Sequence, residues 1–174
     1  MRKKLKKIGV LGGTFDPAHI GHLKISTLAK KKFKLNDIIW AITKKNPFKK
    51  KGYNNLNRRI KLANKVIKGK SFIKIRCYED KIKSNKTYHL IKFLKKKYKR
   101  DEIFFLMGAD NLINFHRWYK WREISSMCKI LVFDRHGYKL KSLKSLSFKR
   151  LSKYRLKFIN FNKVNISSSK LRKI

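Results

Sequence analysis

One stretch near the N-terminus decides the fold: Gly9-Val10-Leu11-Gly12-Gly13-Thr14-Phe15-Asp16-Pro17-Ala18-His19-Ile20-Gly21-His22-Leu23. Its opening apolar run predicts a buried strand. The glycine pair after that run lets the backbone turn sharply and approach a ligand, because no Cβ stands in the way. The Asp-Pro dipeptide is a turn signal, and helical apolar spacing begins at Leu23 and continues to Ala29. The stretch therefore predicts a strand, a glycine turn and a helix.

Two histidines stand where this helix starts. A helix N-terminus that follows a glycine turn directs backbone N–H groups and the positive end of the helix dipole at an anion. His19 and His22 are three residues apart, so both imidazoles can face the same anion. The alternative is that the two histidines merely cap or pack the turn.

Beyond this stretch the chain alternates apolar runs with helical patterns. Runs of strand length occupy residues 37–43, 72–78, 103–107, 129–133 and 158–161, and helical spacing covers residues 56–68 and 87–98. The Lys-, Ser- and Leu-rich segment 138–154 predicts a partly helical excursion. Apolar strands alternating with helices are typical of a parallel sheet covered on both faces. We therefore expect a single Rossmann-like α/β domain over residues 1–174, with a mostly parallel sheet and ligands at the carboxyl ends of its strands.

The charge of the chain is extreme and does not by itself decide the function. The 49 Lys and Arg residues against 9 Asp and Glu give a formal net charge of +40. Because the lysines are spread over every segment, we interpret them as a solvated surface that attracts phosphorylated substrates, with a selected basic patch as the alternative. No apolar run approaches the roughly 20 residues of a membrane span, and no signal-peptide pattern opens the chain. We expect a cytoplasmic protein without a membrane partner or a specific nucleic-acid partner.

The turn and its histidines carry a family resemblance. Gly-Gly-Thr-Phe-Asp-Pro followed by His-Ile-Gly-His resembles the nucleotidyltransferases with a His-x-Gly-His signature, and most of all the nicotinate-nucleotide adenylyltransferases of NAD biosynthesis. The resemblance implies that ATP and nicotinate mononucleotide are joined to give nicotinate adenine dinucleotide and pyrophosphate. It also implies that His19 and His22 are catalytic and that ATP is bound by the turn residues Gly12, Gly13, Thr14 and Phe15.

A second match lies near the end of the chain. Ile166-Ser167-Ser168-Ser169-Lys170-Leu171-Arg172 resembles the family signature Ile-Ser-Ser-Thr-x-Ile-Arg, with Ser169 in place of the threonine. Hydroxyl and N–H groups at a helix start suit an anion, and a guanidinium adds a fork for phosphate. The resemblance implies that Ser168 and Arg172 bind ATP. An ordinary serine N-cap is the alternative.

A third match follows the most apolar strand. Gly108-Ala109-Asp110, a short helix and then Trp118 resemble the family pattern. The resemblance places Gly108 and Asp110 at ATP, Trp118 against the pyridine ring, and the backbone N–H of Tyr119 at the nicotinate carboxylate. Asp110 could instead be a helix N-cap, and a tryptophan here could be a core anchor, which fits Trp121 better than Trp118.

Three further matches are partial. Ser84-Asn85-Lys86-Thr87-Tyr88 agrees with the family's Ser-Tyr-Thr element only at Thr87, which would bind the nicotinate end. Asn46-Pro47-Phe48-Lys49 agrees with Pro-Pro-His-Lys except at the histidine, so Lys49 would meet a phosphate, with Lys50 and Lys51 as alternatives. Arg59 corresponds to an arginine usual in the family, and a solvated surface role fits it equally well.

The implied reaction needs alignment more than acid–base chemistry. The attacking phosphate of the mononucleotide is already ionised, so the enzyme positions it and stabilises charge on the oxygens. We expect Mg²⁺ to arrive with ATP, without a dedicated protein metal site, because few carboxylates are available. Asp16 is expected to order the turn rather than to react.

Three other classes of protein share some of these features. A pantetheine-phosphate adenylyltransferase shares the two histidines and the serine signature but lacks the Gly-Ala-Asp…Trp element. A class I aminoacyl-tRNA synthetase also carries His-Ile-Gly-His, yet 174 residues are too few for one. A basic nucleic-acid-binding protein would explain the charge. The sequence leaves the oligomeric state open, with an oligomer possible.

Overall fold

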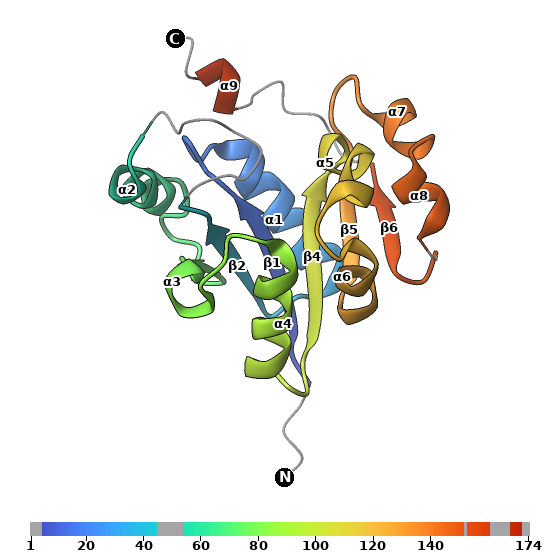
Figure 1. Cartoon of the computed structure of the whole chain (residues 1–174). Helices are drawn as coiled ribbons and strands as arrows, with labels where there is room; N and C mark the ends of the chain where they lie inside the picture. Colours follow the sequence, from blue (N-terminus) through green and yellow to red (C-terminus); the bar gives the residue numbers. More distant parts are fainter. Residues whose placement is uncertain (1–4, 45–53, 152, 161–167, 172–174) are drawn as a thin grey trace.

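A six-stranded, entirely parallel sheet forms the centre of the computed structural model, which describes residues 5–44, 54–151, 153–160 and 168–171. The spatial order is β3-β2-β1-β4-β5-β6 (Figure 1). The strands are β1 (Lys7–Gly13), β2 (Asp37–Ile42), β3 (Ile73–Arg76), β4 (Glu102–Gly108), β5 (Lys129–Phe133) and β6 (Leu156–Ile159). The order reverses between β1 and β4, so the predicted Rossmann-like architecture and its switch point are confirmed.

Helices cover both faces of this sheet. They are α1 (Ile20–Phe33), α2 (Leu56–Val66), α3 (Glu79–Ile82), α4 (Thr87–Lys97), α5 (Ala109–Ile113), the 3₁₀ turn η1 (Phe115–Arg117), α6 (Trp121–Met127), α7 (Lys139–Leu143), α8 (Leu146–Arg150) and α9 (Ser168–Leu171). In Figure 1, α4 and α6 lie in front of the sheet and α1 lies behind it.

The two covered faces correspond to two apolar clusters. The cluster beneath α4 and α6 includes Val10, Ile91 and Ile124. The cluster beneath α1 and α2 includes Trp40 and Ala63. Successive residues of a strand point to opposite faces, so a strand that feeds both clusters must be apolar throughout. This explains why the central strands appear in the sequence as uninterrupted apolar runs.

The edges of the sheet differ from the sequence expectation. The last strand is Leu156–Ile159, two residues earlier than the expected start at 158, because Leu156 is buried while Lys157 beside it is exposed; residue 161 of the expected range lies outside the described residues. The strand expected over residues 72–78 ends at Arg76, since Tyr78 turns into the other apolar cluster. The helical excursion expected over residues 138–154 is present as α7 and α8, whereas α3 and α6 were not anticipated.

The structure also bears on membrane spans and on the two cysteines. Within the ranges given above, no helix is both long and apolar enough to cross a membrane. Cys77 and Cys128 are both free thiols, and burial raises the pKa of the Cys128 thiol to about 12.

Candidate active site

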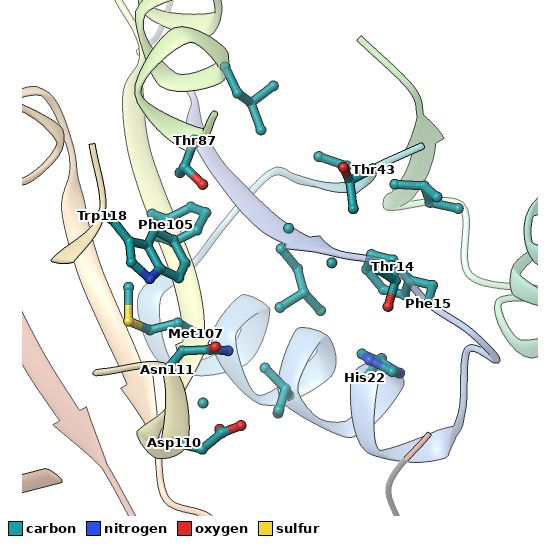
Figure 2. Close-up of a pocket in the computed structure, with 18 of the residues that line it drawn as sticks. Thr14, Phe15, His22, Thr43, Thr87, Phe105, Met107, Asp110, Asn111 and Trp118 are labelled. Atoms are coloured by element: carbon teal, nitrogen blue, oxygen red, sulfur yellow. The ribbon is translucent and has the colours of Figure 1, made fainter. Parts of the chain in front are cut away.

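A cavity of about 720 Å³ opens at the carboxyl ends of β1, β2, β4 and β5. Ligands of parallel α/β sheets bind at this edge, beside the point where the strand order reverses. Figure 2 shows its interior, with His22 and Thr14 on one side and Trp118 and Thr87 on the other. The predicted site residues that line it are Gly12, Gly13, Thr14, Phe15, His19, His22, Thr87, Gly108, Asp110, Trp118, Tyr119 and Ser168. Lys49 and Arg172 lie outside the described residues, and the binding roles of all these residues remain predictions.

The two histidines begin helix α1 as a reciprocal cap. His19 is the N-cap residue, and its Nδ1 accepts a hydrogen bond from the Gly21 N–H at 3.1 Å. The Nδ1 of His22 accepts from the backbone N–H of His19, also at 3.1 Å. Two N–H groups that a helix start leaves without helical partners are thereby satisfied. The capping role and the ligand-facing role are therefore compatible, because each uses a different ring nitrogen.

This capping assigns the tautomer of each imidazole. A ring nitrogen that accepts a hydrogen bond carries no proton, so the proton of each neutral ring is on Nε2. The His22 ring lies 3.9 Å from the His19 ring and 4.7 Å from the Phe15 ring, between centroids. Burial lowers the pKa of His22 to about 3, and the neighbouring His19 and Arg135 act in the same direction. Burial, with Arg135, lowers the pKa of His19 to about 4. The site thus offers two neutral N–H donors at physiological pH.

The Arg59 side chain is buried and hydrogen-bonds to the glycine turn. The alternative of a solvated surface role for this residue is therefore wrong. Its side chain is only 4% exposed. One guanidinium nitrogen donates to the carbonyl oxygens of Thr14 and Thr43, both at 2.7 Å. The other two nitrogens donate to the carbonyls of Lys44 at 2.9 Å and Asn54 at 3.2 Å. A buried guanidinium needs such partners, and here they tie the turn, the end of β2 and the start of α2 together.

Asp16 acts on the same turn, as the sequence predicted. It is 3% exposed and accepts hydrogen bonds from the backbone N–H and the side-chain amide of Asn54, at 3.1 and 2.8 Å. The hydroxyl of Ser168 donates to the Pro17 carbonyl at 2.9 Å, so the C-terminal motif lies beside the N-terminal turn. In this structure the Ser168 hydroxyl proton is therefore used in a hydrogen bond to the turn.

The Gly-Ala-Asp element follows β4 at the floor of the cavity. Asp110 is not an N-cap, because Gly108 caps α5 and Asp110 stands one residue inside the helix. Its Oδ2 pairs with Arg135 at 2.5 Å, while its Oδ1 is buried without a hydrogen-bond partner. A Cβ on Gly108 would lie 2.4 Å from that Oδ1. A side chain at this position would therefore displace the Asp110 carboxylate from its present place.

The far end of the cavity is aromatic. Trp118 is partly buried, with its ring edge-on to Phe105 at 6.2 Å and to Phe115 at 5.3 Å, between centroids. Figure 2 places Thr87 close to Trp118 and Phe105. Trp121 also packs against Phe115, at 6.0 Å, which agrees with its expected role as an anchor. Trp118 therefore packs against the core and also lines the cavity.

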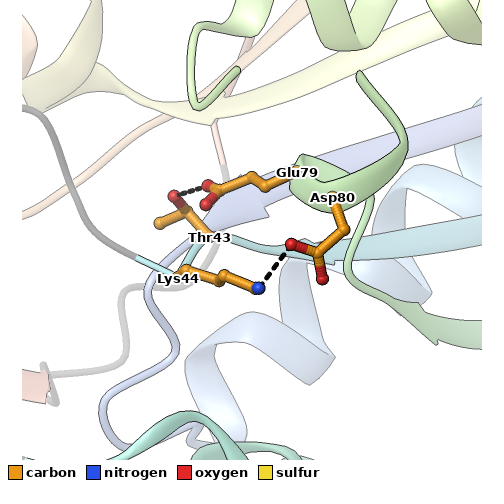
Figure 3. A network of polar contacts seen from close by, with 4 residues as sticks. All are labelled: Thr43, Lys44, Glu79 and Asp80. Atoms are coloured by element: carbon orange, nitrogen blue, oxygen red, sulfur yellow. Dashed lines mark hydrogen bonds and ion pairs between the residues drawn. The ribbon is translucent and has the colours of Figure 1, made fainter. Parts of the chain in front are cut away.

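Several polar residues that line the cavity had no role predicted from the sequence, among them Thr43, Glu79, Asp134 and Arg135. Thr43, Asp134 and Arg135 directly follow strands β2 and β5, so their position could have identified them. Glu79 belongs to the unanticipated α3. The Thr43 hydroxyl donates to Glu79, and Lys44 pairs with Asp80, with 2.5 Å between Nζ and Oδ1; Figure 3 draws both contacts. These contacts connect the end of β2 with helix α3, which precedes Thr87 in the chain.

Comparisons with known proteins agree with this geometry. The sequence model of the cytidylyltransferase-like family matches residues 10–174. A relative from Pelagibacter ubique, named as a nicotinate-nucleotide adenylyltransferase, is 60% identical over all 174 residues, which cover 96% of that relative. One from Ruegeria sp. with the same name is 35% identical over 86% of this chain and 78% of its own. The solved structure of Plasmodium falciparum nicotinic acid mononucleotide adenylyltransferase complexed with NaAD superimposes with a TM-score of 0.81, at 21% identity, covering 97% of this chain and 83% of that one.

Proposed function

The chain belongs to the nicotinate-nucleotide adenylyltransferases of the cytidylyltransferase-like family, and from this premise we propose how its pocket carries out the reaction. The reaction joins ATP and nicotinate mononucleotide to give nicotinate adenine dinucleotide and pyrophosphate. The observation that carries the proposal is the pair of neutral imidazoles at one end of a cavity whose other end is aromatic. One end suits phosphate groups and the other suits a flat ring.

At the phosphate end, the two histidines act as hydrogen-bond donors. An oxygen of the mononucleotide phosphate attacks the α-phosphorus of ATP, and the bond to the departing pyrophosphate breaks. The attacking oxygen carries no proton at neutral pH, so no general base is required. The Nε2–H groups of His19 and His22 donate to the oxygens on which charge accumulates. Their backbone hydrogen bonds fix both rings beforehand, which is the condition for effective charge stabilisation.

The glycine turn and the Gly-Ala-Asp element receive the rest of ATP. Gly12 and Gly13 let the backbone approach the nucleotide closely, beside Thr14 and Phe15. The unpartnered Oδ1 of Asp110 is an acceptor that a sugar hydroxyl of the nucleotide would satisfy. Ser168, Lys49 and Arg172 remain candidates for the phosphates.

At the aromatic end, Trp118 supplies a face for the pyridine ring. The Thr87 hydroxyl and the Tyr119 backbone N–H are the donors that we assign to the nicotinate carboxylate. Both residues line the cavity.

Mg²⁺ fits this site as a companion of ATP. Of the three cavity carboxylates in the described ranges, Asp110 is paired with Arg135, Glu79 accepts from Thr43, and the third belongs to Asp134. We propose that the nucleotide phosphates hold the ion, which neutralises their charge, while the protein aligns the two substrates.

The purified protein, assayed with ATP and three acceptors, tests the proposal. Nicotinate mononucleotide should exceed nicotinamide mononucleotide by roughly tenfold or more in kcat/KM, because the amide NH₂ would meet donors without an acceptor of its own. Phosphopantetheine has no ring to stack and should be a very poor acceptor. If phosphopantetheine were the better acceptor, the substrate assignment would be wrong.

A further inference from the structure

We propose that Lys86 is a specificity-determining residue, whose ammonium group attracts the carboxylate on the pyridine ring of the acceptor. The inference rests on the proposed function. It adds a discrimination by charge to the hydrogen bonds of Thr87 and Tyr119.

Lys86 lies at the aromatic end of the cavity. It is the N-cap residue of α4, with extended backbone dihedrals (φ −85°, ψ 132°), and it immediately precedes Thr87. Among the described residues that line the cavity it is the one lysine, although the chain has 49 Lys and Arg residues. The other lining cations are Arg117 and Arg135, and Arg135 is paired with Asp110. A lysine at this place is therefore not a simple consequence of the basic composition.

The Lys86 ammonium is held by an aromatic ring. It lies 4.3 Å from the centroid of Tyr119. Tyr119 in turn meets Tyr88 and His89 edge-on, at 5.6 and 5.7 Å between centroids. A cation–π contact positions an ammonium group without neutralising its charge.

No acid neutralises this lysine in the described part of the chain. The ion pairs there are Lys44–Asp80, Lys129–Glu102 and Arg135–Asp110. The Lys86 ammonium thus gives the aromatic end of the cavity a positive charge that can pair with an anionic group of a ligand.

A charge at this position adds to the discrimination that the hydrogen bonds supply. An N–H or O–H donor can bond to the carbonyl oxygen of an amide as well as to a carboxylate oxygen. An ammonium group favours the carboxylate by its charge. Lys86 is exposed to solvent, and exposed ion pairs change an equilibrium by up to about fivefold. We therefore expect a selectivity effect of about fivefold at low salt, which added salt weakens.

The experiment compares Lys86→Met with Lys120→Met. Methionine keeps an apolar stem and removes the charge. Lys120 is a matched control, because its ammonium also lies over the Tyr119 ring, at 5.7 Å, yet it does not line the cavity. Each variant lowers the net charge by one, so long-range attraction of anions changes equally in both. The measured quantity is the ratio of kcat/KM for nicotinate to that for nicotinamide mononucleotide, at low and at physiological salt.

We expect the ratio to fall about fivefold in Lys86→Met at low salt and to stay at the wild-type value in Lys120→Met. The wild-type ratio should decrease as salt is added, and the ratio of Lys86→Met should decrease less, because only the long-range attraction by the remaining positive charges is left. An equal loss on both acceptors would overturn the proposal, because Lys86 would then act on the phosphate or on the fold. An unchanged ratio would overturn it as well. A wild-type protein that adenylates neither mononucleotide would instead refute the proposed function, so the two failures are distinguishable.

Discussion

The two ends of the cavity are held in place by different forces. At the phosphate end, hydrogen bonds to backbone groups fix the glycine turn and both imidazoles, through the buried Arg59 and Asp16 and the caps of His19 and His22. At the aromatic end, edge-to-face ring contacts position Trp118 and leave the Tyr119 side chain 46% exposed.

Directional bonds fix donors to the small tolerance that charge stabilisation needs, whereas ring contacts tolerate some displacement. The phosphate end should therefore control turnover, and the aromatic end should control which acceptor binds.

The largest expected effect is at the phosphate end, where two substitutions separate the roles of the two ring nitrogens of His22. His22→Asn keeps an acceptor near the position of Nδ1 and removes the Nε2–H donor. It should lower kcat by a factor on the order of 10² or more, as for loss of a preorganised donor. His22→Ala and His19→Ala should lose at least as much.

His22→Gln is the complementary control, because its amide N–H₂ reaches the position of Nε2 while the cap is lost. It should retain more turnover than His22→Asn but unfold more easily, by about 1 kcal/mol. Steady-state kinetics and urea unfolding measure the two effects. Turnover near the wild-type value in folded His22→Asn would remove the histidine from the mechanism.

A smaller effect is expected at the aromatic end. Trp118→Ala removes the face on which the pyridine ring stacks, and loss of such a contact costs about 1–3 kcal/mol. We expect KM for nicotinate mononucleotide to rise roughly tenfold, with ATP binding nearly unchanged. Trp118→Phe should recover most of the affinity, since it keeps an aromatic face. If Trp118→Ala weakened only the binding of ATP, the assignment of nicotinate mononucleotide to this end of the cavity would be wrong.

The sequence predicted the phosphate end more fully than the aromatic end, for a physical reason. The glycine turn, the two histidines and Asp16 are neighbours in sequence, so one local pattern contains most of that end. The parallel sheet was equally accessible, because strands buried on both faces must be apolar throughout.

What escaped prediction depends on contacts between distant segments. Arg59 is a polar residue on a helix with exposed neighbours, and only the fold shows that its guanidinium reaches the Thr14 and Thr43 carbonyls. The pair of Arg135 with Asp110 joins residues 25 positions apart. The Lys86 ammonium is positioned by the Tyr119 ring, and no sequence pattern relates these two residues.

The smallest expected effect concerns the pH dependence of stability, and it tests how firmly the phosphate end holds His22 neutral. The ring is enclosed by Phe15, His19 and Trp40, and burial lowers its pKa from 6.5 to about 3. In the unfolded chain His22 gains a proton as the pH falls through 6.5. In the folded protein the His22 ring stays neutral until the pH falls to about 3. The unfolded state then binds more protons, so the free energy of unfolding decreases as the pH falls over this window.

Between pH 7 and pH 5.5 the loss due to His22 should be about 1 kcal/mol, and it should be absent in His22→Asn, which cannot titrate. Urea unfolding of both proteins at the two pH values isolates this difference, because the other titrating groups are common to both. The sign is decisive. If the wild type lost no more stability than His22→Asn, His22 would take up its proton equally in the folded and unfolded states. The buried environment of the turn would then not be holding a neutral ring, and the phosphate end would be as adaptable as the aromatic one.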